Sequence, residues 1–145
     1  MSLSKRIDVF INNKAVFGIL SILMRIMMSA IFILSGCGKM FNYTETYNYM
    51  SSMGVSGLLL PLVILTEFGG GVAFLLGYKV RVVSIILFGF CIVSALIFHT
   101  GSDQQSQIMF MKNISMAGGF LSTFIFGGGS FSLGNKKYNK QSHNI

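Results

Sequence analysis

The stretch that decides the fold is Val82–Phe98, which reads VVSIILFGFCIVSALIF and contains no charged side chain. It makes up most of an apolar run from Val80 to Phe98, in which only Arg81, near the start, is charged. An α-helix needs about 20 apolar residues to cross the ~30 Å hydrocarbon core of a bilayer. The run therefore predicts a membrane-spanning helix.

Three further runs have a similar length and composition: Val16–Cys37, Leu58–Leu76 and Ile108–Phe126. Each contains one charged residue: Arg25 in Val16–Cys37, Glu67 in Leu58–Leu76 and Lys112 in Ile108–Phe126. The sequence therefore predicts an all-α membrane protein, a four-transmembrane-helix bundle.

The composition excludes the main soluble classes. Hydrophobic residues make up 52% of the chain and charged residues 10%, and the mean hydropathy is +0.69. A soluble domain has about 25% charged residues, so this chain has too little polar surface to cover a globule in water. Its net charge of +7 lies in short clusters at the ends of the apolar runs rather than on one basic face, which argues against a nucleic-acid partner.

The basic clusters predict the orientation, because cytoplasmic loops carry an excess of Lys and Arg. With four spans, all three clusters fall on one side: Lys5, Arg6 and Lys14; Lys79 and Arg81; Lys136, Lys137 and Lys140. Both termini are therefore predicted to be cytoplasmic (N-in/C-in). The predicted organisation is a cytoplasmic segment at 1–14, a membrane domain at 15–133 and a disordered cytoplasmic tail at 134–145.

The loop on the opposite side, Gly38–Gly57, is rich in Tyr, Ser and Asn. Tyr rings suit a membrane–water interface, so a short amphipathic helix is expected there. A disulfide between Cys37 and Cys91 is disfavoured, because Cys91 is predicted to lie ~10 Å deeper in the membrane than Cys37.

Two opposite charges lie inside the apolar runs, and a charge in hydrocarbon needs a partner or a polar cavity. Counted from the ends of their helices, Arg25 and Glu67 both lie ~15 Å deep. The sequence therefore predicts an Arg25–Glu67 ion pair. Two interpretations stay open: a structural pair that fixes the helix register, or the charged floor of a site that binds a ligand or handles protons.

A second polar group gathers near the outer ends of the last two spans. His99 ends the third run, while Lys112 and Asn113 lie near the start of the fourth, and Lys39 and Glu45 follow the first. A His at a helix end is commonly an interfacial anchor or a cap, but it titrates near neutral pH and can serve as a proton donor. Arg25, Glu67, His99, Lys112 and Asn113 are the candidate ligand-binding or proton-handling residues.

Several segments resemble the DoxX family of small bacterial membrane proteins. They are Leu34-Ser35-Gly36 with Lys39, Thr66-Glu67-Phe68-Gly69-Gly70-Gly71, Gly77-Tyr78-Lys79-Val80-Arg81, Ile108-Met109-Phe110-Met111-Lys112-Asn113, Ala117-Gly118-Gly119-Phe120-Leu121, Phe126-Gly127 and Ser132-Leu133. Their order and spacing cover roughly residues 23–134. The one departure is Gly134, where the family usually has an acidic residue after Ser-Leu.

The resemblance implies a four-helix bundle in the bacterial inner membrane. The family takes its name from a small subunit of a thiosulfate:quinone oxidoreductase, and other members are linked to oxidative-stress or thiol-redox complexes. The resemblance therefore implies an accessory or quinone-interacting subunit that depends on a redox partner protein, with a quinone as the implied cofactor. No metal site is predicted. The alternatives are a small-solute carrier or pore acting as a homo-oligomer, or a purely structural membrane partner.

Overall fold

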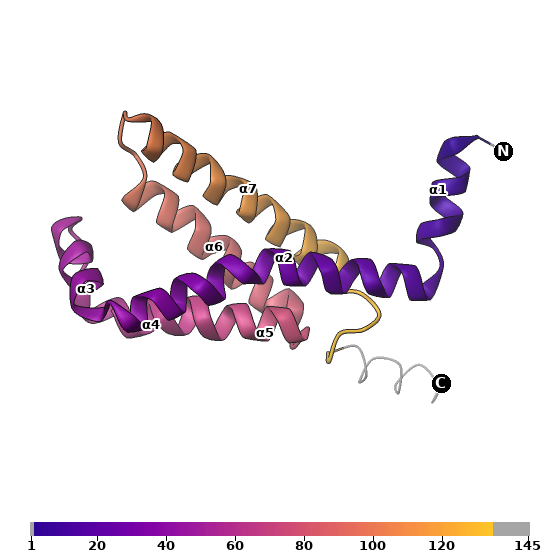
Figure 1. Cartoon of the computed structure of the whole chain (residues 1–145), viewed down its shortest axis with the longest axis horizontal. Coiled ribbons are helices and arrows are strands. Elements are labelled where there is room, and N and C mark those ends of the chain that lie inside the picture. Colours follow the sequence, from indigo (N-terminus) through magenta and orange to yellow (C-terminus); the bar gives the residue numbers. More distant parts are fainter. Residues whose placement is uncertain (1, 135–145) are drawn as a thin grey trace.

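The computed structural model describes residues 2–134, and the regular secondary structure in this range is helical (Figure 1). Its elements are α1 (Leu3–Ile11), α2 (Lys14–Phe41), α3 (Tyr43–Ser52), η1 (Gly57–Leu59), α4 (Leu60–Ile64), η2 (Leu65–Gly69), α5 (Gly70–Leu76), α6 (Val80–Phe98) and α7 (Gln104–Phe126). Four stretches are long and apolar enough to cross a membrane: Lys14–Phe41, Gly57–Leu76, Val80–Phe98 and Gln104–Phe126. The predicted four-helix membrane bundle is confirmed, and the orientation of its termini stays a prediction.

The spans are apolar on the outside as well as inside. On α6, Val82, Ile86 and Leu96 are each more than half exposed, whereas Ser84 and Cys91 on the same helix are fully buried. A water-soluble helix shows the opposite arrangement, with its apolar stripe turned inward. The outer surface of the bundle is therefore matched to lipid rather than to water.

The first span is longer than its apolar run predicts. Asn13 caps the start of α2 by accepting a hydrogen bond from the Ala15 backbone N–H at 3.0 Å, and the helix continues to Phe41. Its 28 residues give ~42 Å of helix, which exceeds the ~30 Å of hydrocarbon. α2 therefore extends beyond the membrane core.

The second span is continuous but not uniform. It begins with the single 3₁₀ turn η1, continues through α4 with Pro61 in its first turn, passes through the π-helical turn η2, and ends as α5. Proline is compatible with the first turn because the backbone N–H groups there have no intrahelical acceptor. The span ends at Gly77, whose φ of 74° closes the tight turn to α6.

The four spans form two antiparallel pairs. α2 packs along α4, η2 and α5, while α6 packs along α7, and α5 joins the pairs by packing on α6. Figure 1 shows the pairs close together near the start of α2 and diverging toward α3. We call the end with the start of α2 and the end of α7 the terminal end, and the end with α3 and the α6–α7 connection the α3 end.

Aromatic side chains hold the two pairs together in the middle. Phe120 of α7 contacts Phe32 of α2 and Phe74 of α5 edge-to-face, with ring centroids 5.2 and 5.1 Å apart. These rings and the buried Leu87 and Cys91 of α6 form the core. Edge-to-face contacts favour one packing geometry over others, so the core fixes how the pairs cross.

The chain after α7 returns to close the terminal end. Residues 127–134, which we call the C-terminal segment, pair with the end of α5: Gly134 N donates to Gly77 O at 3.1 Å. Gly128 packs on Val80 and Gly129 on Ser21, at distances that leave no room for a Cβ. The sequence analysis assigned no packing role to this region, so its contacts are a finding of the structure.

The segments outside the four spans were predicted with mixed success. α3 confirms the helix expected in the Gly38–Gly57 loop, whereas α1 lies in a segment for which no helix was predicted. Cys37 and Cys91 are free thiols, as expected from their different depths. The predicted disordered tail at 134–145 lies, apart from Gly134, outside the described residues.

Candidate functional site

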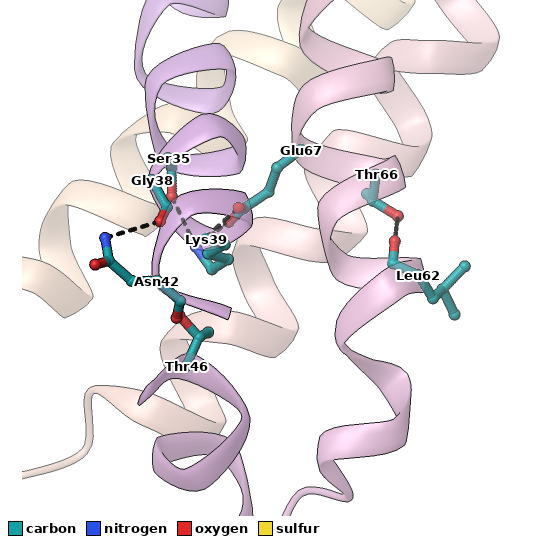
Figure 2. A network of polar contacts seen from close by, with 8 residues as sticks. All are labelled: Ser35, Gly38, Lys39, Asn42, Thr46, Leu62, Thr66 and Glu67. Carbon is teal, nitrogen blue, oxygen red and sulfur yellow. Dashed lines mark hydrogen bonds and ion pairs between the residues drawn. The ribbon is translucent and has the colours of Figure 1, made fainter. Parts of the chain in front are cut away.

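The buried carboxylate of the second span pairs with a lysine of the first. Lys39 Nζ lies 2.8 Å from Glu67 Oε2 and donates a hydrogen bond to Oε1 at 3.0 Å (Figure 2). It also donates to Ser35 Oγ at 2.7 Å, one helical turn earlier. The Glu67 side chain is 8% exposed and that of Lys39 is 25% exposed, so the pair lies at the boundary between the core and a more open space.

The predicted Arg25–Glu67 ion pair is therefore wrong. A Cβ on Gly36 would meet Phe68, and one on Gly71 would meet Ile33 and Phe32, which fixes the antiparallel register. This register sets Glu67 opposite a position one helical turn or less from Lys39. It sets Arg25 near the Gly77 turn, ~15 Å further along the axis. The prediction assumed that the two spans begin and end at the same levels, whereas this packing offsets them along the helix axis.

Arg25 instead belongs to the terminal end. It is 2% exposed, its Nη2 donates to Phe131 O at 2.9 Å, and its Nη1 lies against Gly77. Gly77 follows the last turn of α5, where the helix dipole is negative and stabilises a nearby cation. Arg25 Nε and Nη1 have no hydrogen-bond partner among residues 2–134. Its role in the structure is to hold the C-terminal segment against the bundle.

Glu67 lies in the π-helical turn η2 (Leu65–Gly69). A π turn adds one residue to an α-helix, at a cost in hydrogen-bond geometry, and such turns occur often at functional sites. Gly70 and Gly71 follow the turn at once; Gly70 lets α6 approach at Leu87, and Gly71 lets α2 approach at Phe32 and Ile33. The extra residue changes the direction in which the Glu67 side chain projects relative to the rest of the helix.

A pocket of about 590 Å³ opens where the two helix pairs diverge. Its walls are mainly apolar side chains from α2, α4, α6 and α7, and α3 contributes Tyr49 and Met50. Its polar lining consists of Ser35, Lys39, Thr46, Tyr49, Thr66, Glu67, Ser94, His99, Lys112 and Asn113. Pockets of 300–1,000 Å³ with apolar walls and a few polar groups are typical small-molecule sites.

The structure brings four of the five candidate residues together. Glu67, His99, Lys112 and Asn113 all line this pocket, whereas Arg25 does not. Lys39 completes the group; the sequence analysis placed it in the same outer polar group but did not name it among the candidate residues. The π turn and Thr66 were also missed, because single-sequence periodicity carries no signal for an inserted residue.

α3 covers one side of the pocket at the α3 end of the bundle. The ring of Tyr49 stacks on that of Phe98 at the end of α6, with centroids 5.8 Å apart. His99, the next residue, also lines a second hollow of about 470 Å³ beside Gln107 and Phe110. It is the only residue that these two hollows share. His99 thus lies between the pocket and the outer surface of the α6–α7 connection.

Comparison with known proteins identifies the family. The DoxX family profile matches residues 20–100, which is more than half of the chain and includes α2, Glu67 and α6. The chain belongs to the DoxX family. The match ends before Lys112 and Asn113, so the family profile does not include these two pocket residues.

Two relatives from Escherichia coli (strain K12) cover most of this DoxX protein. Inner membrane protein YqjF is 44% identical over 118 residues, which are 79% of this chain and 91% of the relative. Inner membrane protein YphA is 31% identical over 123 residues, covering 79% and 88%. No solved structure matches. With four membrane-spanning helices, the protein is a multi-pass protein of the bacterial inner membrane.

Proposed function

We propose that this DoxX-family protein is a quinone-interacting accessory subunit of a membrane redox system, and that the quinone ring binds in the pocket at the α3 end. The observation that carries the proposal is the composition of that pocket. The pocket has a volume of about 590 Å³, mainly apolar walls and a small set of polar groups. A quinone has the matching form, an apolar ring with two carbonyl oxygens that accept hydrogen bonds.

The polar residues divide into two roles in this proposal. Lys112 and Asn113 lie more than two turns inside α7; they carry N–H donors and would hydrogen-bond a quinone carbonyl oxygen. Glu67 and His99 would carry protons, because a carboxylate and an imidazole both exchange protons readily. Electron transfer is assigned to a partner protein of the redox system.

The closed terminal end favours binding over passage. The pocket is lined by residues of the α3 end, whereas the C-terminal segment and Arg25 fill the opposite end of the bundle. This arrangement argues against a continuous pore through a single chain. It also separates the pocket from the residues that hold the helix ends together.

The test is binding of a short-chain quinone analogue to the purified protein in lipid nanodiscs. We expect Glu67→Gln to weaken binding about tenfold or more, because it removes the charged partner that holds Lys39 beside the pocket, and a hydrogen bond to a charged group contributes about 1.5–3 kcal/mol. Glu45→Gln is the matched control, since Glu45 is an exposed carboxylate of α3 outside the pocket. Equal affinity in the wild type and both variants would reject the site.

Loss of the Glu67 charge could also disturb folding, so a second variant is needed. Lys112→Met removes a pocket donor from an exposed position, and its unfolding is expected to match the wild type. We expect it to weaken analogue binding as well. Unchanged binding in Lys112→Met would show that Lys112 does not bind the quinone carbonyl.

A further inference from the structure

The helix before the first span has an apolar face that the bundle does not cover. No residue of α1 is buried. Leu3 is 75% exposed and Phe10 is 61% exposed, although both are large apolar side chains. In Figure 1, α1 leaves the start of α2 at a steep angle and stands apart from the other helices.

α1 is amphipathic along its length. At ~100° per residue, Leu3, Ile7, Phe10 and Ile11 fall within about a third of the helix circumference. Lys5, Asp8 and Asn12 fall on the opposite face, with Arg6 at the margin. Ser2 caps the helix start by accepting a hydrogen bond from Lys5 N at 3.4 Å. The apolar face therefore belongs to a helix that has a capped start.

The connection to α2 sets the position of this face. Only Asn12 and Asn13 separate α1 from α2, and Asn13 caps the start of α2. Because α2 crosses the membrane and begins directly after Asn13, the end of α1 lies near the membrane surface. A helix that leaves a membrane span at a steep angle lies along the plane of the bilayer, where its apolar face meets the acyl-chain boundary.

The charges around α1 indicate the lipid. Lys5, Arg6 and Lys14 carry three positive charges against the single negative charge of Asp8. A cationic excess beside an interfacial helix is attracted by anionic headgroups, and the attraction adds up residue by residue. A second protein copy would have to supply both an apolar groove and acidic groups, whereas an anionic leaflet supplies both at once.

We propose that α1 is a membrane-surface helix that inserts Leu3, Ile7, Phe10 and Ile11 into the leaflet at the terminal end and binds anionic phospholipid through Lys5, Arg6 and Lys14. The proposal is independent of the pocket and of any quinone. It holds for either orientation of the protein, because it concerns only the leaflet next to the start of α2.

The absence of Trp from the chain makes a direct test available. The full-length protein carrying Phe10→Trp is reconstituted into vesicles that contain phosphatidylglycerol and lipids with brominated acyl chains. We expect blue-shifted emission that the brominated lipid quenches. Asn12→Trp is the matched control on the polar face, and we expect its emission to be red-shifted and weakly quenched.

The charge part of the proposal is tested in the Phe10→Trp background. Lys5→Gln and Arg6→Gln should each weaken docking about fivefold in anionic vesicles and leave it unchanged in phosphatidylcholine vesicles. Equal effects in both lipids would overturn the anionic-lipid assignment. Equally weak quenching of the Phe10→Trp and Asn12→Trp variants would place α1 in water. Shielding that rises with protein density rather than with brominated lipid would assign the face to a second copy.

Discussion

At the terminal end, glycines let α2, α5 and the C-terminal segment meet at close range around the buried Arg25, whereas at the α3 end the helix pairs diverge around a pocket. Both ends contain a buried charge, but the charges are used differently. Arg25 bonds a backbone carbonyl and holds the chain together, while Glu67 pairs with a lysine beside an open space. A buried charge therefore indicates function only after its partner is known.

The largest expected effect compares two glycines with the same backbone conformation. Gly77 at the terminal end and Gly54 at the α3 end have φ of 74° and 78°, but only Gly77 is surrounded, by Arg25 and Ser132. Alanine at either position costs about 1–2 kcal/mol for the left-handed backbone. Gly77→Ala adds overpacking of about 1–3 kcal/mol. We expect Gly77→Ala to lower the unfolding free energy in micelles clearly more than Gly54→Ala; equal losses would mean that the terminal end is not tightly packed.

The next effect concerns the hydrogen bond from Arg25 to the C-terminal segment. Arg25→Met leaves the Phe131 carbonyl without its donor, which should cost about 1–3 kcal/mol of stability. Arg81→Met is the control, because Arg81 is exposed at the same end, and we expect a change within about 0.5 kcal/mol. Analogue affinity of the folded Arg25→Met protein should equal that of the wild type; a loss would connect the two ends.

The smallest effect concerns the surface of the α3 end. Asp103 accepts hydrogen bonds from the Ser106 side chain at 2.6 Å and from the Ser106 backbone at 2.9 Å. These hydrogen bonds stabilise the carboxylate and hold the pKa of Asp103 below its ordinary value. The cap at the start of α7 is therefore fully formed above the ordinary carboxyl pKa and weakens as the pH falls through the lowered pKa.

Ser106→Ala tests this arrangement. Removal of the hydroxyl donor should raise the pKa of Asp103 toward its ordinary value, which an NMR titration of the carboxyl carbon would detect. Stability at neutral pH should change little, because the group lies at the surface. An unchanged Asp103 pKa in Ser106→Ala would show that the backbone N–H groups alone stabilise the carboxylate.

Much of the fold followed from the sequence because lipid imposes simple rules. The apolar runs gave all four spans, since backbone groups in hydrocarbon must be satisfied within a helix. The helix in the Gly38–Gly57 loop followed from local residue chemistry. The polar group at His99, Lys112 and Asn113 followed from topology, because the ends of consecutive antiparallel helices meet on one side.

The partner of Glu67 did not follow, because the depth counts for Arg25 and Glu67 assumed that the first two spans begin and end at the same levels. The register between these helices is set by side-chain packing at Gly36 and Gly71, which periodicity within one helix does not encode. The C-terminal segment was missed because its contacts join residues far apart in the sequence, as between Arg25 and Phe131.

The most direct test of this account is a pair of double-mutant cycles on the stability of the purified protein. One cycle combines Lys39→Met with Glu67→Gln, and the other combines Arg25→Met with Glu67→Gln. We predict a coupling free energy of about 0.5–3 kcal/mol in the first cycle, because contacting residues couple by that amount. The second cycle should be additive to within about 0.5 kcal/mol, because the residues lie far apart. Coupling in the Arg25 cycle and additivity in the Lys39 cycle would contradict the account.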